Sequence, residues 1–146
     1  MRRILLAVCG LTPQVITETM YALCQQGRMV DGIRIVTTRD GRDQVNAQLL
    51  EPNSGAYYRF LHDFGLDGAE IDFASRHIRT VADDYGREIA DIRDEEDNAL
   101  FLRACMEMAH SLTSDPDTEV YFSIAGGRKT MGACLALAAQ FYARRR

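Results

Sequence analysis

Arg3-Ile-Leu-Leu-Ala-Val-Cys9, followed at once by Gly10-Leu-Thr-Pro13, is the stretch that decides the fold class. A nearly continuous apolar run of this length is typical of a strand buried on both faces of a parallel sheet. Proline suits the first position of a helix, and Thr12 before it is a good N-cap, so we expect a helix from about Pro13 to Gln26. The stretch therefore predicts the first strand, turn and helix of an α/β domain.

The rest of the chain repeats this alternation. Alternating strands and helices predict an open, mostly parallel Rossmann-like sheet with helices on both faces, in a single domain of residues 1–146. Because the chain stops straight after a helix, we expect a C-terminally truncated fragment. The segment 67–91 fits either loop or short strands at 70–73 and 77–81. The further elements expected are strands at 33–37 and 119–124, helices at 43–50, 56–64 and 128–142, and a helix from Asp94 to just before Asp115-Pro116.

Composition narrows the choice of ligand. With 47% apolar and 26% charged residues the chain resembles a globular protein with a core. The net charge of −4 argues against a duplex nucleic acid as partner, because duplexes are bound by extended basic faces. A small anionic ligand needs only a local basic cluster. No apolar run reaches membrane-spanning length and no signal-peptide cleavage region follows the start, so we expect no membrane contact and a cytoplasmic protein.

Metal and cofactor chemistry finds no support in the sequence. The four cysteines lie in apolar segments without a Cys-x-x-Cys spacing, and the three histidines are scattered, so we expect no metal and no cofactor. Neither G-x-x-x-x-G-K-[ST] nor G-x-G-x-x-G occurs at the glycine turns, which argues against nucleoside triphosphatases and dinucleotide dehydrogenases.

The second informative stretch is Ser123-Ile-Ala-Gly-Gly-Arg-Lys-Thr-Met131, which contains the only lysine of the chain, Lys129. Cations in the first turn of a helix are unfavourable by roughly 0.3–1 kcal/mol, so Arg128 and Lys129 side by side call for an anion. The alternative is an ordinary strand-to-helix loop whose basic side chains lie in solvent.

Both glycine turns follow strands, and ligands of open α/β sheets bind at that edge, where the strand order reverses. If the first strand neighbours the strand that carries Tyr121, the two turns form one cleft. Its donors would be the backbone N–H groups of two helix starts, the hydroxyls of Thr12 and Ser123, the Gln14 amide and the two cations. Thr37 and Thr38, at the end of the second strand, could face the same cleft.

Three segments resemble the CRISPR-associated Rossmann-fold (CARF) proteins, and within them the small ring nucleases of type III CRISPR systems. The segments are Leu5 to Thr19, Asp91 to Asn98 and Ser123 to Met131. The resemblance implies a homodimer that binds cyclic oligoadenylate, a second messenger. We expect cyclic tetra-adenylate first, with the hexa- and tri-adenylate rings behind it.

The resemblance also implies a reaction, in which the ribose 2′-OH attacks the neighbouring phosphate without a metal. The product would be linear di-adenylate ending in a 2′,3′-cyclic phosphate. Lys129 is expected to stabilise the transition state, Thr12 or Ser123 to orient phosphate or hydroxyl, and Arg128 to share the charge or to pair with a carboxylate of the fold. Ligand contacts are expected from Gly10, Leu11, Gln14, Thr37, Thr38, Asn98, Ala125, Gly126, Gly127, Arg128 and Thr130.

Alternatives stay open at this point. Asp94 and Asp97 fit a helix cap better than a ligand contact, and Thr12 fits either role. The whole chain also fits a CARF sensor domain that binds the ring without cutting it, as part of a larger effector. An unrelated α/β protein that binds a nucleotide or a phosphorylated metabolite is a third interpretation.

Overall fold

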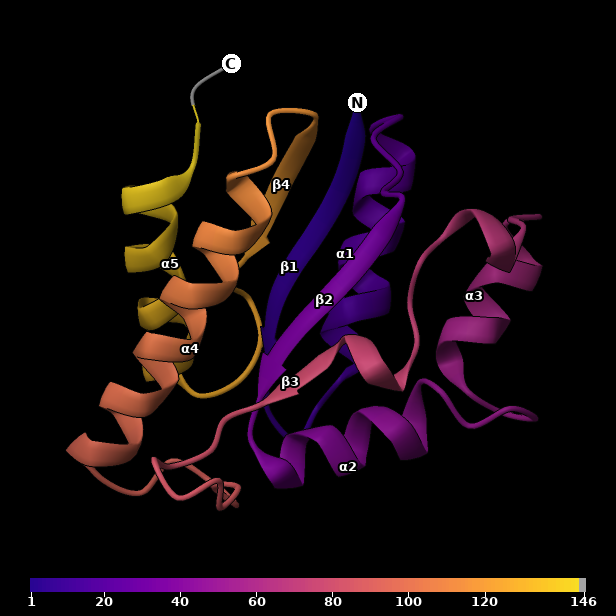
Figure 1. Ribbon diagram of the computed structural model, residues 1–146. Coiled ribbons are helices and arrows are strands. Elements are labelled where there is room, and N and C mark those ends of the chain that lie inside the picture. Colours follow the sequence, from indigo (N-terminus) through magenta and orange to yellow (C-terminus); the bar gives the residue numbers. More distant parts are fainter. Residues whose placement is uncertain (145–146) are drawn as a thin grey trace.

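Four parallel strands lie in the order β3-β2-β1-β4 in the computed structural model, which describes residues 1–144 (Figure 1). This arrangement confirms the predicted open, parallel, Rossmann-like sheet. The first strand and the strand that carries Tyr121 are neighbours, as the cleft hypothesis requires, with Leu5 paired to Tyr121. The strands are β1 (Arg2–Cys9), β2 (Gly32–Thr37), β3 (Ile78–Thr80) and β4 (Thr118–Ser123).

Helices cover both faces of this sheet, and alternate residues of β1 feed two separate cores. Leu5 and Ala7 pack towards helices α1, α2 and α3, whereas Leu6 and Val8 pack towards α4 and α5. Because neighbouring residues of a strand point to opposite faces, a strand buried on both sides needs the continuous apolar run seen in the sequence. The two helix groups lie on opposite sides of the sheet in Figure 1. They are α1 (Gln14–Gln25), α2 (Arg39–Gln48), α3 (Ala56–Asp63), α4 (Glu95–Thr113) and α5 (Lys129–Tyr142).

One helix starts earlier than predicted, and one segment that the sequence left open has a defined structure. Helix α2 begins at Arg39 rather than at residue 43, because Thr38 caps it: the Thr38 hydroxyl accepts a hydrogen bond of 3.3 Å from the Gly41 N–H. In the segment 67–91, which the sequence left open, β3 is the one named strand, preceded by two short 3₁₀ turns at Gly68–Glu70 and Ser75–His77.

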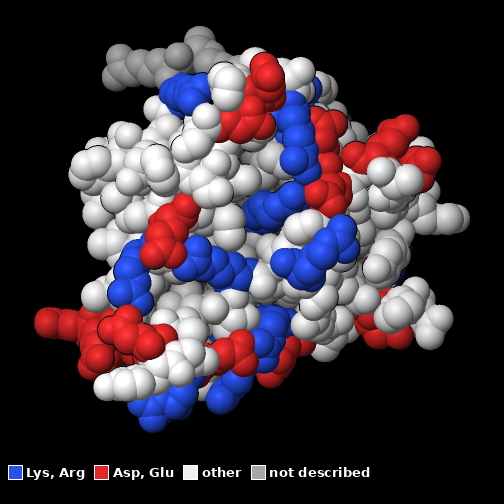
Figure 2. Space-filling model, viewed as in Figure 1, with Lys and Arg blue, Asp and Glu red and all other residues white. Residues whose placement is uncertain are grey.

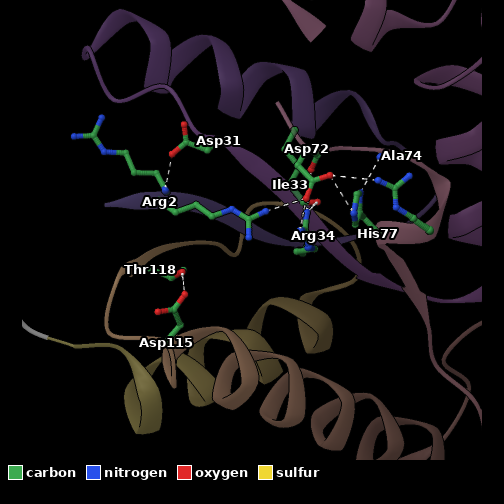
Figure 3. Close-up of polar contacts among 11 residues, drawn as sticks. Arg2, Asp31, Ile33, Arg34, Asp72, Ala74, His77, Asp115 and Thr118 are labelled. Carbon is green, nitrogen blue, oxygen red and sulfur yellow. Dashed lines mark hydrogen bonds and ion pairs between the residues drawn. The ribbon is translucent and has the colours of Figure 1, made fainter. Parts of the chain in front are cut away.

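Asp72 connects this irregular segment to the sheet (Figure 3). Its carboxylate accepts hydrogen bonds from Arg34 of β2 at 2.8 Å and from Arg2 of β1 at 2.9 Å. The ring of His77 lies 3.4 Å away on the other side. The Arg34 hydrogen bond lowers the pKa of Asp72 below its usual value. Through these contacts Asp72 holds the loop that leads into β3 against the two central strands.

Charges of both signs intermix over the face shown in Figure 2. Arg79 of β3 pairs with Glu107 of α4, and Arg103 donates to Asp84 at 2.9 Å. Within residues 1–144 no helix has the length and apolarity needed to cross a membrane.

Candidate functional site

A cleft of about 560 Å³ lies where β1 and β4 end, at the point where the strand order reverses. It opens between the turn after β1 and the turn after β4, and its volume is in the range of small-molecule sites. We call it the glycine cleft. Its lining consists of Gly10, Leu11, Thr12, Gln14, Val15, Glu18, Thr38, Asp91, Ala125, Gly126, Gly127, Arg128 and Met131.

The two turns are in direct backbone contact, and only glycine permits it. A Cβ on Gly10 would lie 3.0 Å from the Gly127 Cα, and one on Gly126 would lie 2.5 Å from the Val8 carbonyl oxygen. Gly127 also has a φ of +76°, in the left-handed region that other residues rarely adopt. The motifs that the sequence singled out therefore meet at one place.

Two of the helices that start at the cleft, α1 and α5, lack a side-chain cap. Pro13 is the N-cap residue of α1 and Arg128 that of α5, and neither side chain makes a capping hydrogen bond. Helices α2 and α4, by contrast, are capped by Thr38 and Asp94. The uncapped helix starts leave backbone N–H donors and the positive ends of two helix dipoles for an anion. The prediction of Thr12 as the N-cap of α1 is wrong, because Pro13 occupies that position; Thr12 is an exposed residue of the cleft.

Arg128 already has an anion in the cleft. Its guanidinium binds Asp91 through two nitrogens, with 3.0 Å between Nε and Oδ1. The Arg128 hydrogen bond lowers the pKa of Asp91, and the same contact raises the pKa of Arg128. Asp91 belongs to a loop fixed to the start of α2, where the Arg39 N–H donates to the Ile89 carbonyl oxygen at 2.9 Å. Two roles were predicted for Arg128, and the structure shows one of them, the pairing with a carboxylate of the fold.

Lys129 is exposed at the first position of α5, directly after Arg128. No carboxylate of residues 1–144 lies within 4.0 Å of its ammonium group, whereas the neighbouring guanidinium is paired with Asp91. Lys129 does not belong to the cleft lining, which ends at Arg128 on this side. A long cation that is unpaired within the described part of the chain therefore lies beside the cleft.

The predicted site residues, taken together, divide into those that line the cleft and those that do not. Nine of them line the cleft: Gly10, Leu11, Thr12, Gln14, Thr38, Ala125, Gly126, Gly127 and Arg128. Five do not: Ser123, Thr37, Asn98, Lys129 and Thr130.

Three of the five outlying residues have positions that explain their absence. Thr37 is fully buried and donates its hydroxyl hydrogen to the Cys9 carbonyl at 2.5 Å, so it braces the end of β1. Ser123 is half-buried at the end of β4, opposite Ala7. Asn98 lies in the first turns of α4, where its side-chain oxygen is buried without a hydrogen-bond partner in residues 1–144.

Sequence reasoning missed four lining residues: Val15, Glu18, Asp91 and Met131. Glu18 had a signal, because it follows Gln14 by four residues and so lies on the same helix face. Asp91 lay in a segment interpreted mainly as a helix cap. The capping itself is confirmed for Asp94, whose carboxylate accepts the Asp97 N–H at 2.8 Å.

Chemically, the glycine cleft combines backbone N–H donors, an arginine and a nearby lysine with the neutral polar groups of Thr12 and Gln14. Such a set binds a phosphate group through hydrogen bonds and charge. Within residues 1–144 no cluster of three or more His, Cys, Asp or Glu side chains could hold a metal ion.

Comparison with known proteins agrees with this architecture. The chain shares its fold with Csm6 of Enterococcus italicus, solved bound to cyclic hexa-2′-fluoro-hexa-dAMP, at a TM-score of 0.54 and 14% sequence identity. The match covers 97% of this chain and 31% of the Csm6 chain, so this chain spans about a third of that protein. Among curated proteins, none matches this chain. The model of the family described as CRISPR-associated protein NE0113 matches residues 12–146. The chain therefore belongs to this CRISPR-associated family, in agreement with the resemblance found in its sequence.

Proposed function

We propose that this chain is a ring nuclease that binds cyclic oligoadenylate, with cyclic tetra-adenylate as the first candidate, and cuts it to linear di-adenylate. The observation that carries the proposal is the contact between the two glycine turns, which unites two uncapped helix starts and Arg128 in one cleft. Membership of a CRISPR-associated family and the fold shared with Csm6 favour this ligand over other phosphates.

The reaction needs no nucleophile from the protein. The ribose 2′-oxygen forms a bond to the adjacent phosphorus, and the bond from phosphorus to the 5′-oxygen of the next adenylate breaks. The 2′-hydroxyl loses its proton and the departing 5′-oxygen gains one, so atoms and charge balance. Two such cuts convert the tetra-adenylate ring into two di-adenylates with 2′,3′-cyclic phosphate ends. What the protein supplies is alignment of the attacking and leaving oxygens and stabilisation of the charge on phosphorus.

Arg128 and Lys129 have different roles in this reaction. Arg128 is held in place by Asp91 inside the cleft and is suited to bind the ground-state phosphate. Lys129 is exposed and unpaired within residues 1–144, so its ammonium group is free to move onto the phosphate as negative charge develops. Thr12 lines the cleft and is the hydroxyl better placed to orient the ligand, whereas Ser123, at the end of β4, is not among the lining residues.

A homodimer fits the symmetry of the ligand. A ring of four identical adenylates has a two-fold axis, and an isologous dimer presents the same cleft twice around such an axis. One ring would then be held by two glycine clefts, each with one pair of cations.

Chromatography of the products after incubation with cyclic tetra-adenylate in EDTA tests the proposal. We expect di-adenylate with a cyclic phosphate end. A ring that binds tightly but stays intact would indicate the alternative, a CARF sensor domain; the match to 31% of the longer Csm6 chain is what favours that alternative. Absence of binding to tetra-, hexa- and tri-adenylate rings alike would refute both.

The variant Lys129→Ala tests the assigned chemistry. We expect it to lower the rate of cutting by a factor of about 100 or more, with a much smaller change in affinity. Arg28→Ala is the matched control, because Arg28 is an exposed cation just beyond the far end of α1. A ring with 2′-deoxy sugars should bind and resist cutting. If Lys129→Ala cuts as fast as the control, the role of Lys129 is wrong.

A further inference from the structure

A second hollow adjoins the glycine cleft and shares one residue with it, Glu18. This hollow has a volume of about 310 Å³ and lies between α1 and α3. We call it the aromatic groove. Its lining consists of Thr17, Glu18, Tyr21, Ala56, Phe60, Asp63 and Phe64.

The groove exposes aromatic surface that the core does not use. Tyr21 is 48% exposed and Phe64 is 38% exposed. Their rings meet edge to face with 5.6 Å between centroids, and Phe60 extends the cluster at 4.7 Å from Phe64. Exposed aromatic side chains next to a phosphate site are the usual platform for a nucleobase, since every base has an apolar face that stacks on them.

The charges of the groove point to the same class of ligand. Its two acidic lining residues are Glu18 and Asp63, and no Lys or Arg contributes to it. A phosphate would be repelled here, whereas a neutral group with N–H donors would be bound. Asp63 lies 3.5 Å from the His62 ring, whereas no basic side chain of residues 1–144 lies within 4.0 Å of the Glu18 carboxylate. An unpaired carboxylate at the border of an anion-binding cleft is an acceptor for a donor on the ligand.

The spacing of residues along α1 matches the distance between the phosphate and the base of one nucleotide. Glu18 lies one helical turn, about 6 Å, beyond Gln14, and Tyr21 about 10 Å beyond it. A phosphate at the start of α1 keeps its ribose within the first turn, while the base and its exocyclic group reach further along the helix. Val15 lies between these positions and gives the cleft an apolar wall.

We propose that the aromatic groove is the base subsite of the glycine cleft. An adenine of the bound ring packs against Tyr21 and Phe64, and its exocyclic amino group donates a hydrogen bond to the Glu18 carboxylate. This subsite rests on the proposed function, because it takes its base from the same cyclic oligoadenylate.

The experiment measures the affinity of two 2′-deoxy rings that resist cutting, one with four adenines and one with four purines that lack the amino group. Tyr21→Ala should weaken both rings roughly 5- to 150-fold, the range of one lost base stack. Tyr85→Ala is the matched control, because Tyr85 is 84% exposed and lines neither hollow. Both tyrosines are exposed enough for the variants to fold, which a thermal melt verifies.

Glu18→Ala tests the hydrogen bond. The wild type should bind the adenine ring more tightly than the purine ring, by fivefold or more. The Glu18 variant should bind the two rings equally. If the preference for the amino group survives in Glu18→Ala, Glu18 is not its acceptor; if Tyr21→Ala binds like Tyr85→Ala, the groove is not the base subsite. A wild type that binds no ring overturns the proposed function together with the subsite, and is thereby distinguished from failure of the subsite alone.

Discussion

The substitution Gly126→Ala tests the contact on which the site depends. The added Cβ would lie 2.5 Å from the Val8 carbonyl oxygen and 2.9 Å from Val15 Cγ1, where ordinary contacts begin at 3.4 Å. The first neighbour is backbone of the central strand and cannot give way, so the turn after β4 must lift away from β1. Overpacking of this kind costs about 1–3 kcal/mol. For a domain near 150 residues that corresponds to a fall in Tm of roughly 2–12 °C.

Two measurements on this variant separate stability from the site. Circular dichroism gives Tm, and titration with the 2′-deoxy ring gives affinity, which should fall because the turn carries the cleft's N–H donors with it. Gly86→Ala is the control: Gly86 has a φ of +80° in open space, so alanine there is strained but meets no neighbour. It should lower Tm while leaving affinity unchanged. A Gly126→Ala protein with the Tm and affinity of the wild type would refute the reasoning.

Three further substitutions probe the carboxylates and the cap. Asp91→Asn removes the carboxylate that holds the Arg128 guanidinium in place, so the ring should bind more weakly in titrations; tighter binding would mean that Asp91 competes with the phosphate for Arg128. Asp72→Asn should lower Tm by more at pH 7 than near pH 3, because a carboxyl whose pKa is depressed in the folded state stabilises fully above its unfolded pKa of about 3.9 and loses that effect progressively as pH falls towards the folded value. An equal Tm loss at both pH values would contradict this. Thr38→Val removes the acceptor of the Gly41 N–H and should cost about 0.5–2 kcal/mol in denaturant unfolding, and no loss would show that the cap is unimportant.

Much of the fold could be predicted because its signals are local. The apolar run of β1 and the glycine turns determine buried strands and tight corners whatever surrounds them. The start of α2 could not be predicted as well, because Val45 is the one large apolar residue in the polar stretch Arg39–Gln48 and the first turn depends on the cap from Thr38. The strand β3 has three residues and is held by Asp72, whose partners Arg2 and Arg34 are distant in sequence.

In the candidate site, too, the local features could be predicted from the sequence and the contacts between distant residues could not. The backbone groups of Gly10 and Gly127 could be placed together from sequence, since parallel strands end at one edge and the two strands were expected to be neighbours. Asp91 could not be assigned to Arg128, because 37 residues and a long helix separate them and several carboxylates were available. The exclusion of Lys129 from the lining depends on side-chain direction at a helix start, which no spacing rule gives.

Helix α1 combines these observations into one argument about recognition. Its start is fixed by β1 and the glycine contact, which together set where a phosphate can bind. Its next two turns carry Glu18 and Tyr21 at fixed rises along the same rigid element. The distance between phosphate and base is thereby set by secondary structure rather than by loops. One nucleotide can span both hollows of one subunit, with its phosphate in the glycine cleft and its base in the aromatic groove. A single ligand that did so in both subunits of the proposed homodimer would need several linked nucleotides. The proposed base subsite and the proposed homodimer therefore depend on each other, because both are needed for this site to select an oligonucleotide ring over a phosphorylated metabolite.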